Sequence, residues 1–199
     1  MRKLALVILI ITTVISANAQ KRFELDVTSK LGYYIPVKET GIPDKYFPKN
    51  AFSPAAGLSL GYNFFKSTSV LLGVEYSYLS PEISDFDGSS LDITWHSLNV
   101  PLNIQQGIGK NFFLSGGITL IRQLKGYYKE NSAFPLQEIP EYNWQAGVGY
   151  KLKDLRISAQ YYRGFKRIDK DIVTGESGWY CPVKHQEVFV KLEYPLWKF

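Results

Sequence analysis

Residues 97–106, SLNVPLNIQQ, alternate between apolar and polar side chains. A β-strand has a side-chain period of two, so this segment predicts a strand with one apolar and one polar face. The GIGK sequence at 107–110 predicts a turn into a second strand. One face carries Leu98, Val100, Leu102 and Ile104, and the other carries Asn99, Pro101, Asn103 and Gln105. The fold depends on which face lies inside.

The spacing of turn signals predicts repeated hairpins. Short polar turns are expected at KSTS (66–69), GIGK (107–110) and KLKD (151–154). Longer segments rich in Pro, Asp, Lys and Gly separate the hairpins, and we expect them to be irregular; they cover residues 37–54, 80–91, 125–141 and 167–184. The pattern predicts no helix after residue 19 and eight strands, at about residues 22–36, 55–65, 69–79, 92–106, 112–124, 142–152, 155–166 and 185–198.

Short and long connections alternate strictly, which places the tight turns and both ends of the barrel chain at one end and the loops at the other. This asymmetry is typical of outer-membrane barrels, and an even number of antiparallel strands closes such a barrel without an unpaired edge. No segment after residue 19 has the roughly 18 to 20 uninterrupted apolar residues of a transmembrane helix. The sequence therefore predicts an all-β, eight-stranded antiparallel up-and-down transmembrane β-barrel.

Strand parity separates two faces along the whole chain. The apolar and aromatic face includes Leu25, Val27 and Leu31 in the first expected strand and Val188, Val190 and Leu192 in the last. The polar face includes Arg22, Glu24, Asp26, Thr28, Lys30, Ser59, Asn63, Glu75, Asn99, Asn103, Gln105, Thr119, Asn143, Gln145, Lys151, Arg156, Ser158, Gln160, Glu187, Lys191 and Glu193. A soluble carrier would place the apolar face inside, and a membrane barrel would place it in lipid.

Side-chain volumes favour the membrane barrel. The polar face also carries Gly57, Gly61, Gly73, Gly117, Gly147 and Gly149. An eight-stranded barrel is only just wide enough for its own side chains, so glycines facing long Arg, Lys and Glu side chains fit a filled polar lumen. We therefore expect paired charges inside and lipid outside.

The 30 aromatic residues among 199 are expected to form two belts at the membrane interfaces. The belt near the tight turns comprises Tyr62, Phe64, Phe65, Phe112, Tyr150, Trp197 and Phe199. The belt near the loops comprises Tyr33, Tyr34, Tyr78, Trp95, Tyr142, Trp144 and Phe165. Two prolines lie inside expected strands, and because proline has no N–H we predict β-bulges at Pro101 and Pro195.

The first 20 residues predict an export signal, because Arg2 and Lys3 precede an apolar run from Leu4 to Ile15 and the small-residue sequence Ala17-Asn18-Ala19. Cleavage after Ala19 leaves a barrel domain of residues 20–199. Without Arg2 and Lys3 the 23 basic residues become 21 against 18 acidic ones, a net charge near +3 that gives no indication of nucleic-acid binding. Cys181 is the only cysteine and excludes an internal disulfide.

Five segments resemble the small outer-membrane β-barrel domain proteins of Gram-negative bacteria that are labelled porin-family or PorT-like. They are LNVPLNI (98–104), FFLSGGITL (112–120), WQAGVGYKL (144–152), YYRGF (161–165) and the terminal Phe199. The resemblance implies a barrel in the outer membrane and says almost nothing about activity. A terminal Phe is similar to the signal by which barrel-assembly machinery selects its clients, although Pro195 interrupts the final alternation.

Catalytic chemistry has few candidates. A rim hydrolase would draw on His96, Ser97, Asp92, His185, Ser177 and Glu176. His96 lies at the start of the fourth expected strand and His185 at the start of the eighth, on opposite sides of an eight-stranded ring, so they are too far apart for a shared dyad or metal. We expect no catalytic residue, no cofactor and no metal.

The most aromatic parts of the loops are DKYFPKN (44–50) and ESGWYCP (176–182), which could anchor an extracellular protein or glycan or could fold back on the barrel mouth. The leading interpretation is an outer-membrane barrel with a plugged polar lumen and a structural or loop-mediated interaction role. Its partners would be outer-membrane lipid and the barrel-assembly machinery, with no nucleic acid. The alternatives are a narrow porin-type pore, a rim hydrolase and a soluble lipocalin-like carrier.

Overall fold

The structure is a computed structural model of the 199-residue chain. It describes residues 23–37, 49–65, 67–84, 90–128, 132–133, 141–165, 168–174, 177–183 and 186–199. Side chains within residues 83–93, 125–133 and 168–183 are outside this description, as are Arg22 and the expected signal segment 1–19. Among the described residues, no helix has the length and apolar character needed to span a membrane.

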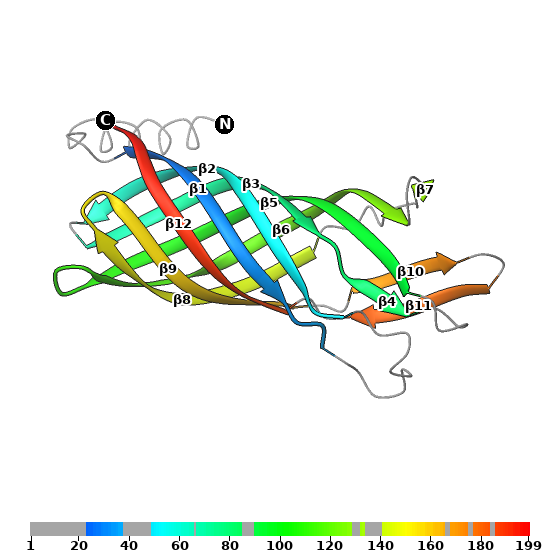
Figure 1. The fold of residues 1–199 in the computed structure, drawn as a ribbon. Helices are drawn as coiled ribbons and strands as arrows, with labels where there is room; N and C mark the ends of the chain where they lie inside the picture. Colours follow the sequence, from blue (N-terminus) through cyan, green and yellow to red (C-terminus); the bar gives the residue numbers. More distant parts are fainter. Residues whose placement is uncertain are drawn as a thin grey trace, which may run out of the picture.

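Eight antiparallel strands form a closed barrel (Figure 1). They are β1 (Phe23–Tyr34), β2 (Ala51–Phe65), β3 (Thr68–Leu79), β5 (Ser90–Ile108), β6 (Phe112–Tyr128), β8 (Glu141–Leu152), β9 (Leu155–Gly164) and β12 (Gln186–Lys198). Their order is β5-β3-β2-β1-β12-β9-β8-β6, and pairing of β5 with β6 closes the ring. All eight expected strands are confirmed within a few residues at their ends.

The two ends of the barrel differ as expected. Short turns join β2 to β3, β5 to β6 and β8 to β9, at the same end as the C-terminus in Figure 1. The first and last strands are tied together there, because the Phe23 and Phe199 N–H groups each donate to the other's carbonyl oxygen at 2.9 and 3.0 Å. At the other end, β4 (Glu82–Ser84) and β7 (Ser132–Ala133) extend the sheet.

Several of the connections expected to be irregular contain strands: β4 lies within 80–91, β7 lies within 125–141, and the expectation is most clearly wrong for 167–184. Residues 167–184 contain a two-stranded hairpin, β10 (Ile168–Thr174) and β11 (Ser177–Val183), which extends beyond the barrel at the loop end in Figure 1. The two strands pair from Ile168 with Val183 to Thr174 with Ser177, so their backbone groups form hydrogen bonds with each other. The polar composition of the segment does not predict this pairing.

The polar face lies inside the barrel, as the sequence predicts. Along β12 the side chains of Glu187, Lys191 and Glu193 are buried, whereas those of Val188 and Val190 are about half exposed. The same alternation runs through β1, β2, β3, β8 and β9. An oily lumen of the lipocalin type is therefore wrong, because the apolar side chains cover the outer wall.

Most of the expected aromatic belts lie on this outer wall, but Tyr34 and Trp95 do not. Both are buried, with 2% and 6% of their surface exposed. Tyr34 shares its strand face with Lys30, and Trp95 shares its face with Asn99. Adjacent side chains of a strand point to opposite faces. Because Tyr33 lies on the outer wall, Tyr34 points into the lumen.

The two prolines behave differently. The register between β1 and β12 shifts where Pro195 pairs with Asp26, which confirms the bulge expected there. No shift occurs at Pro101, so that prediction is wrong. Instead, Gly73 and Val74 of β3 have no pairing partner on β5, and the residues before and after this gap pair in the same register. Gly73 makes room for the proline ring, because a Cβ at Gly73 would lie 3.0 Å from Pro101 Cγ.

Glycines on the inner face allow close packing across the lumen wall. A Cβ added at Gly117 would lie 2.1 Å from the Leu102 carbonyl oxygen, and one at Gly149 would lie 2.1 Å from the Phe113 ring. At Gly32 it would lie 1.5 Å from a carboxylate oxygen of Glu187. A larger side chain would therefore clash at Gly117 and Gly149, as expected from the sequence, whereas Gly61 has room, because its Cβ would lie 3.7 Å from the nearest atom.

Neighbouring glycines on β6 provide a matched test of lumen packing. Gly117→Ala should lower the free energy of unfolding by about 1–3 kcal/mol, because backbone atoms of β5 occupy the space. Gly116→Ala should have little effect, since its Cβ would meet nothing closer than 3.8 Å. Urea titration of the barrel in phospholipid vesicles measures both values, and equal losses would contradict the packing described.

Lipid exposure of the outer wall can be tested along β2. Leu58 is half exposed near the middle of this strand, and Phe65 is exposed at its short-turn end. Leu58→Arg should lower the free energy of unfolding in vesicles by at least about 2 kcal/mol, whereas Phe65→Arg at the interface should cost about 1 kcal/mol or less. A wall that faces water would instead tolerate both substitutions equally.

Candidate functional site in the barrel lumen

A cluster of ion pairs centres on Arg156 of β9. Its guanidinium contacts Glu24 at 3.0 Å and the Asp26 carboxylate, and Nε lies 3.7 Å from Glu193. The side chains of Arg156, Asp26 and Glu193 are at most 8% exposed. A buried charge is tolerated when it is paired, so Arg156 neutralises carboxylates from β1 and β12.

A second set of ion pairs continues toward the loop end. Lys191 of β12 contacts Glu75 across the lumen at 2.9 Å and Glu193 at 3.3 Å. Lys30 of β1 contacts Glu187 at 3.1 Å. Together the two sets join five carboxylates to three cations on β1, β3, β9 and β12.

The opposite wall of the lumen carries amides. On β5, β6 and β8 the Gln145 amide donates to Asn103, and Thr119 donates to the Gln145 carbonyl oxygen at 3.1 Å. The charged and amide walls meet where Gln105 donates to Glu193 at 2.7 Å. Such a network leaves little space for water between the walls.

Aromatic side chains close the lumen on the loop side of these charges. Lys30 Nζ lies 4.7 Å from the ring centre of Phe189 and 5.1 Å from that of Tyr162. Tyr162, Phe189 and Ile121 form a buried apolar cluster. The cavities here have volumes of about 10 and 20 Å³, each enough for about one water molecule.

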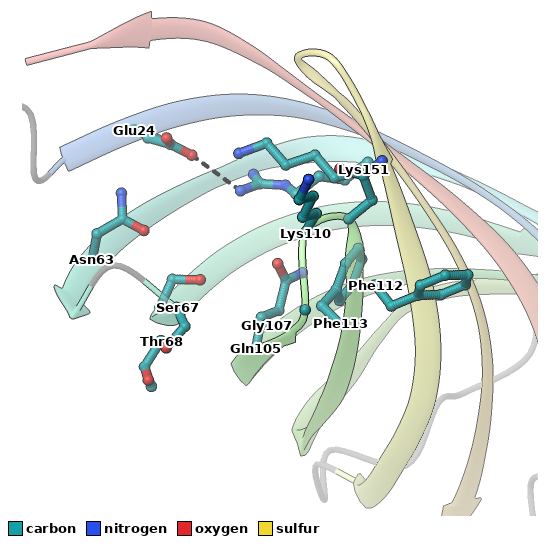
Figure 2. Close-up of a pocket in the computed structure, with 14 residues that line it drawn as sticks. Glu24, Asn63, Ser67, Thr68, Gln105, Gly107, Lys110, Phe112, Phe113 and Lys151 are labelled. Atoms are coloured by element: carbon teal, nitrogen blue, oxygen red, sulfur yellow. Dashed lines mark hydrogen bonds and ion pairs between the residues drawn. The ribbon is translucent and has the colours of Figure 1, made fainter.

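A larger cavity of about 180 Å³ lies at the short-turn mouth, and we call it the vestibule (Figure 2). Its lining includes Glu24, Asn63, Ser67, Thr68, Ser69, Gln105, Gly107, Lys110, Asn111, Phe113, Lys151 and Arg156. Phe113 is buried, and Arg156 with Glu24 forms part of the inner boundary. Lys151, expected on the polar lumen face, is exposed at this mouth.

The described residues assemble no hydrolase site. Ser97 is buried in the lumen, whereas His96 contacts Tyr76 and Tyr78 on the outer wall, so these neighbours face opposite sides. Glu176 and His185 lie outside the described residues, as do the side chains of Asp92, Ser177 and Cys181. Among described residues, no three His, Cys, Asp or Glu side chains are placed to hold a metal.

Sequence reasoning missed the aromatic closure of the lumen. Tyr162 shares its parity with Ser158 and Gln160, and Phe189 shares its parity with Glu187 and Lys191. Strand parity alone could therefore have placed both rings inside. The particular ion-pair partners could not be found this way, because parity gives the face of a residue and not its height relative to distant strands.

Removing the central cation should be costly. Arg156→Met leaves Glu24, Asp26 and Glu193 without their shared partner, and we expect the free energy of unfolding to fall by about 3–5 kcal/mol. Lys198→Met is the control, because Lys198 pairs with the exposed Asp154 at the rim and should change stability little. Urea titration in vesicles measures both; a small loss for Arg156→Met would indicate that water reaches the carboxylates.

Comparison with known proteins shows the fold. No protein-family model matches the chain, and no curated protein matches it. The crystal structure of Neisserial surface protein A (NspA) aligns with a TM-score of 0.60 at 13% identity, covering 85% of this chain and 96% of that chain. Ail of Yersinia pestis in complex with sucrose octasulfate aligns with a TM-score of 0.50 at 15% identity, covering 87% and 99%. The chain therefore has the closed, eight-stranded antiparallel fold of small outer-membrane β-barrels.

Proposed function

We propose that this chain is an integral outer-membrane protein whose closed barrel is a rigid, non-conducting support for its long loops. Residues 1–19 would direct export, and residues 20–199 would form the barrel domain. We also propose that the chain is related by descent to the porin-family or PorT-like barrels that it resembles. The proposal assigns no enzymatic activity, cofactor or nucleic-acid partner.

The filled lumen is the observation that carries this proposal. Ions crossing the barrel would have to break pairs such as Lys191 with Glu75 and Lys30 with Glu187, whose side chains are at most 6% exposed. They would also have to pass the layer containing Tyr162 and Phe189, where the cavities accept about one water each. A closed lumen favours a structural or interaction role over a narrow pore.

The loop end is the surface that such a support would present. The β10–β11 hairpin extends beyond the barrel at this end, and β4 and β7 extend the wall formed by β5 and β6 at the same end (Figure 1). We propose that these connections contact an extracellular protein or glycan, while the outer wall contacts lipid and the barrel-assembly machinery inserts the chain. One structural neighbour, Ail, was solved with a heparin analogue, which makes a glycan a reasonable first class of partner to screen.

Conductance in planar bilayers tests the closed lumen. The purified, folded chain should give no steady ion current above the bare membrane, because the cavities between the charged network and the aromatic layer, as far as the structure describes them, hold about one water each. A general porin inserted under the same conditions is the positive control. Heat-modifiable gel mobility should confirm that the tested chain is folded.

A steady current from the folded chain would contradict the proposal and favour the narrow-pore alternative. Cell fractionation tests the proposed location independently. The chain should be recovered with outer membranes and require detergent for extraction. Recovery in the soluble periplasm would contradict the membrane location whatever the conductance result.

A further inference from the structure

The vestibule at the short-turn mouth has a surplus of positive charge. Lys110, Lys151 and Arg156 line it together with the single carboxylate of Glu24. Arg156 is neutralised by Glu24 and by deeper carboxylates. The surplus therefore comes from the two lysines.

Neither lysine has an ion-pair partner among the described residues. Asp154 is the acidic residue of the adjacent turn, and its carboxylate is held by Lys198 at 2.7 Å. Lys151 affects Asp154 only through their longer-range attraction. Lys110 and Lys151 therefore remain available to a negatively charged ligand.

Strand pairing brings the backbone of Lys151 and the turn that carries Lys110 to the same mouth of the barrel. The Lys151 N–H donates to the Asn111 carbonyl oxygen at 2.8 Å, and Asn111 Nδ2 donates to the Tyr150 hydroxyl at 2.8 Å. The pairing of β6 with β8 thus fixes the turn that carries Lys110 against the strand end that carries Lys151. Both lysines line the vestibule, so an anion bound there would lie close to two positive charges.

Polar groups line the other side of the same cavity. Figure 2 shows Asn63, Ser67 and Thr68 across the mouth from Lys110 and Lys151. The turn that carries Ser67 is held by a bond from the Gly107 N–H to the Ser67 carbonyl oxygen at 2.6 Å. An anion with several acceptor oxygens could use the lysines on one side and amide or hydroxyl donors on the other.

The volume of the vestibule fits a small ligand that enters the cavity but does not cross the barrel. A volume of about 180 Å³ is below the range of typical drug-sized sites, and it exceeds the inner cavities several-fold. Phe113 and the Arg156 to Glu24 ion pair bound the cavity toward the lumen. The ligand would reach it from the short-turn side.

We propose that the vestibule binds a phosphate group, with Lys110 and Lys151 as its charge partners and Asn63 as a hydrogen-bond donor. Phosphate offers the negative charge and the multiple acceptor oxygens that this lining matches. The group could belong to a soluble phosphate ester or to a phospholipid headgroup at the membrane rim. The site is separate from the loops and does not depend on their proposed role.

Titration with glycerol 3-phosphate tests the site. The full folded barrel in neutral detergent micelles is followed by NMR of its lysine side-chain groups. Wild type should show saturable shifts, and Lys110→Gln/Lys151→Gln should weaken binding about tenfold or more. Lys153→Gln removes a lysine charge from the same end outside the vestibule without releasing Asp154 from Lys198, and it should bind within about twofold of wild type. Lys110→Arg/Lys151→Arg keeps the charges and should retain binding.

Nanodiscs distinguish the two sources of phosphate. The same titration is repeated in phosphatidylcholine discs and in discs with a quarter phosphatidylglycerol. The negative surface of the phosphatidylglycerol discs repels glycerol 3-phosphate and should weaken its apparent affinity for every variant. If a headgroup occupies the vestibule, the loss should be larger in wild type than in Lys110→Gln/Lys151→Gln. If the ligand is soluble, the two should lose affinity by the same factor.

Three results would overturn the proposal. These are no saturable shift in folded wild-type barrel, unchanged affinity in Lys110→Gln/Lys151→Gln, and an equal loss in the Lys153→Gln control. The last result would mean that the overall charge of the rim, and not the vestibule, attracts phosphate. Unheated gel mobility verifies that every variant compared is folded.

Discussion

Charges enclosed in a narrow barrel need partners of opposite charge, and this constraint organises the structure. Arg156 and Lys191 share the carboxylate of Glu193, which links the two sets of ion pairs into one network. A substitution that removed one member would leave its partners buried and uncompensated. The network therefore makes a polar lumen compatible with a stable barrel, and under the proposed function it also prevents ions from passing.

The outer wall meets the opposite requirement. Lipid offers no hydrogen bonds, so backbone groups have to be satisfied within the sheet, and closure through β5 with β6 and β1 with β12 achieves this. Because every barrel strand is paired on both sides, alternate side chains of each strand point outward. The outer face is apolar because the apolar residues occupy these alternate positions. Residues at the two ends of the barrel are free of this requirement, so polar and charged side chains can lie there. They form the loops at one end and the lysine-rich vestibule at the other.

Strand positions and the inside face were predictable because both depend on local alternation and turn spacing. Tyr34 and Trp95 were assigned to lipid by residue type, and the strict period of two overrides residue type. The bulge expected at Pro101 is absent because Gly73 on the neighbouring strand accepts the proline ring, a contact that depends on register. The β10–β11 hairpin and the convergence of Lys110 with Lys151 also depend on which distant segments become neighbours.

The central claim is that hydrocarbon surrounds the apolar face while the polar face is enclosed. Nuclear Overhauser effects between lipid acyl chains and side-chain methyl groups of the barrel in nanodiscs test it most directly. Methyl groups of Val190 and Leu192 on the outer wall should contact acyl chains, and the methyl groups of Thr28 and Thr119 in the lumen should not. Acyl-chain contacts at Thr28 and Thr119, with none at Val190 and Leu192, would contradict the account.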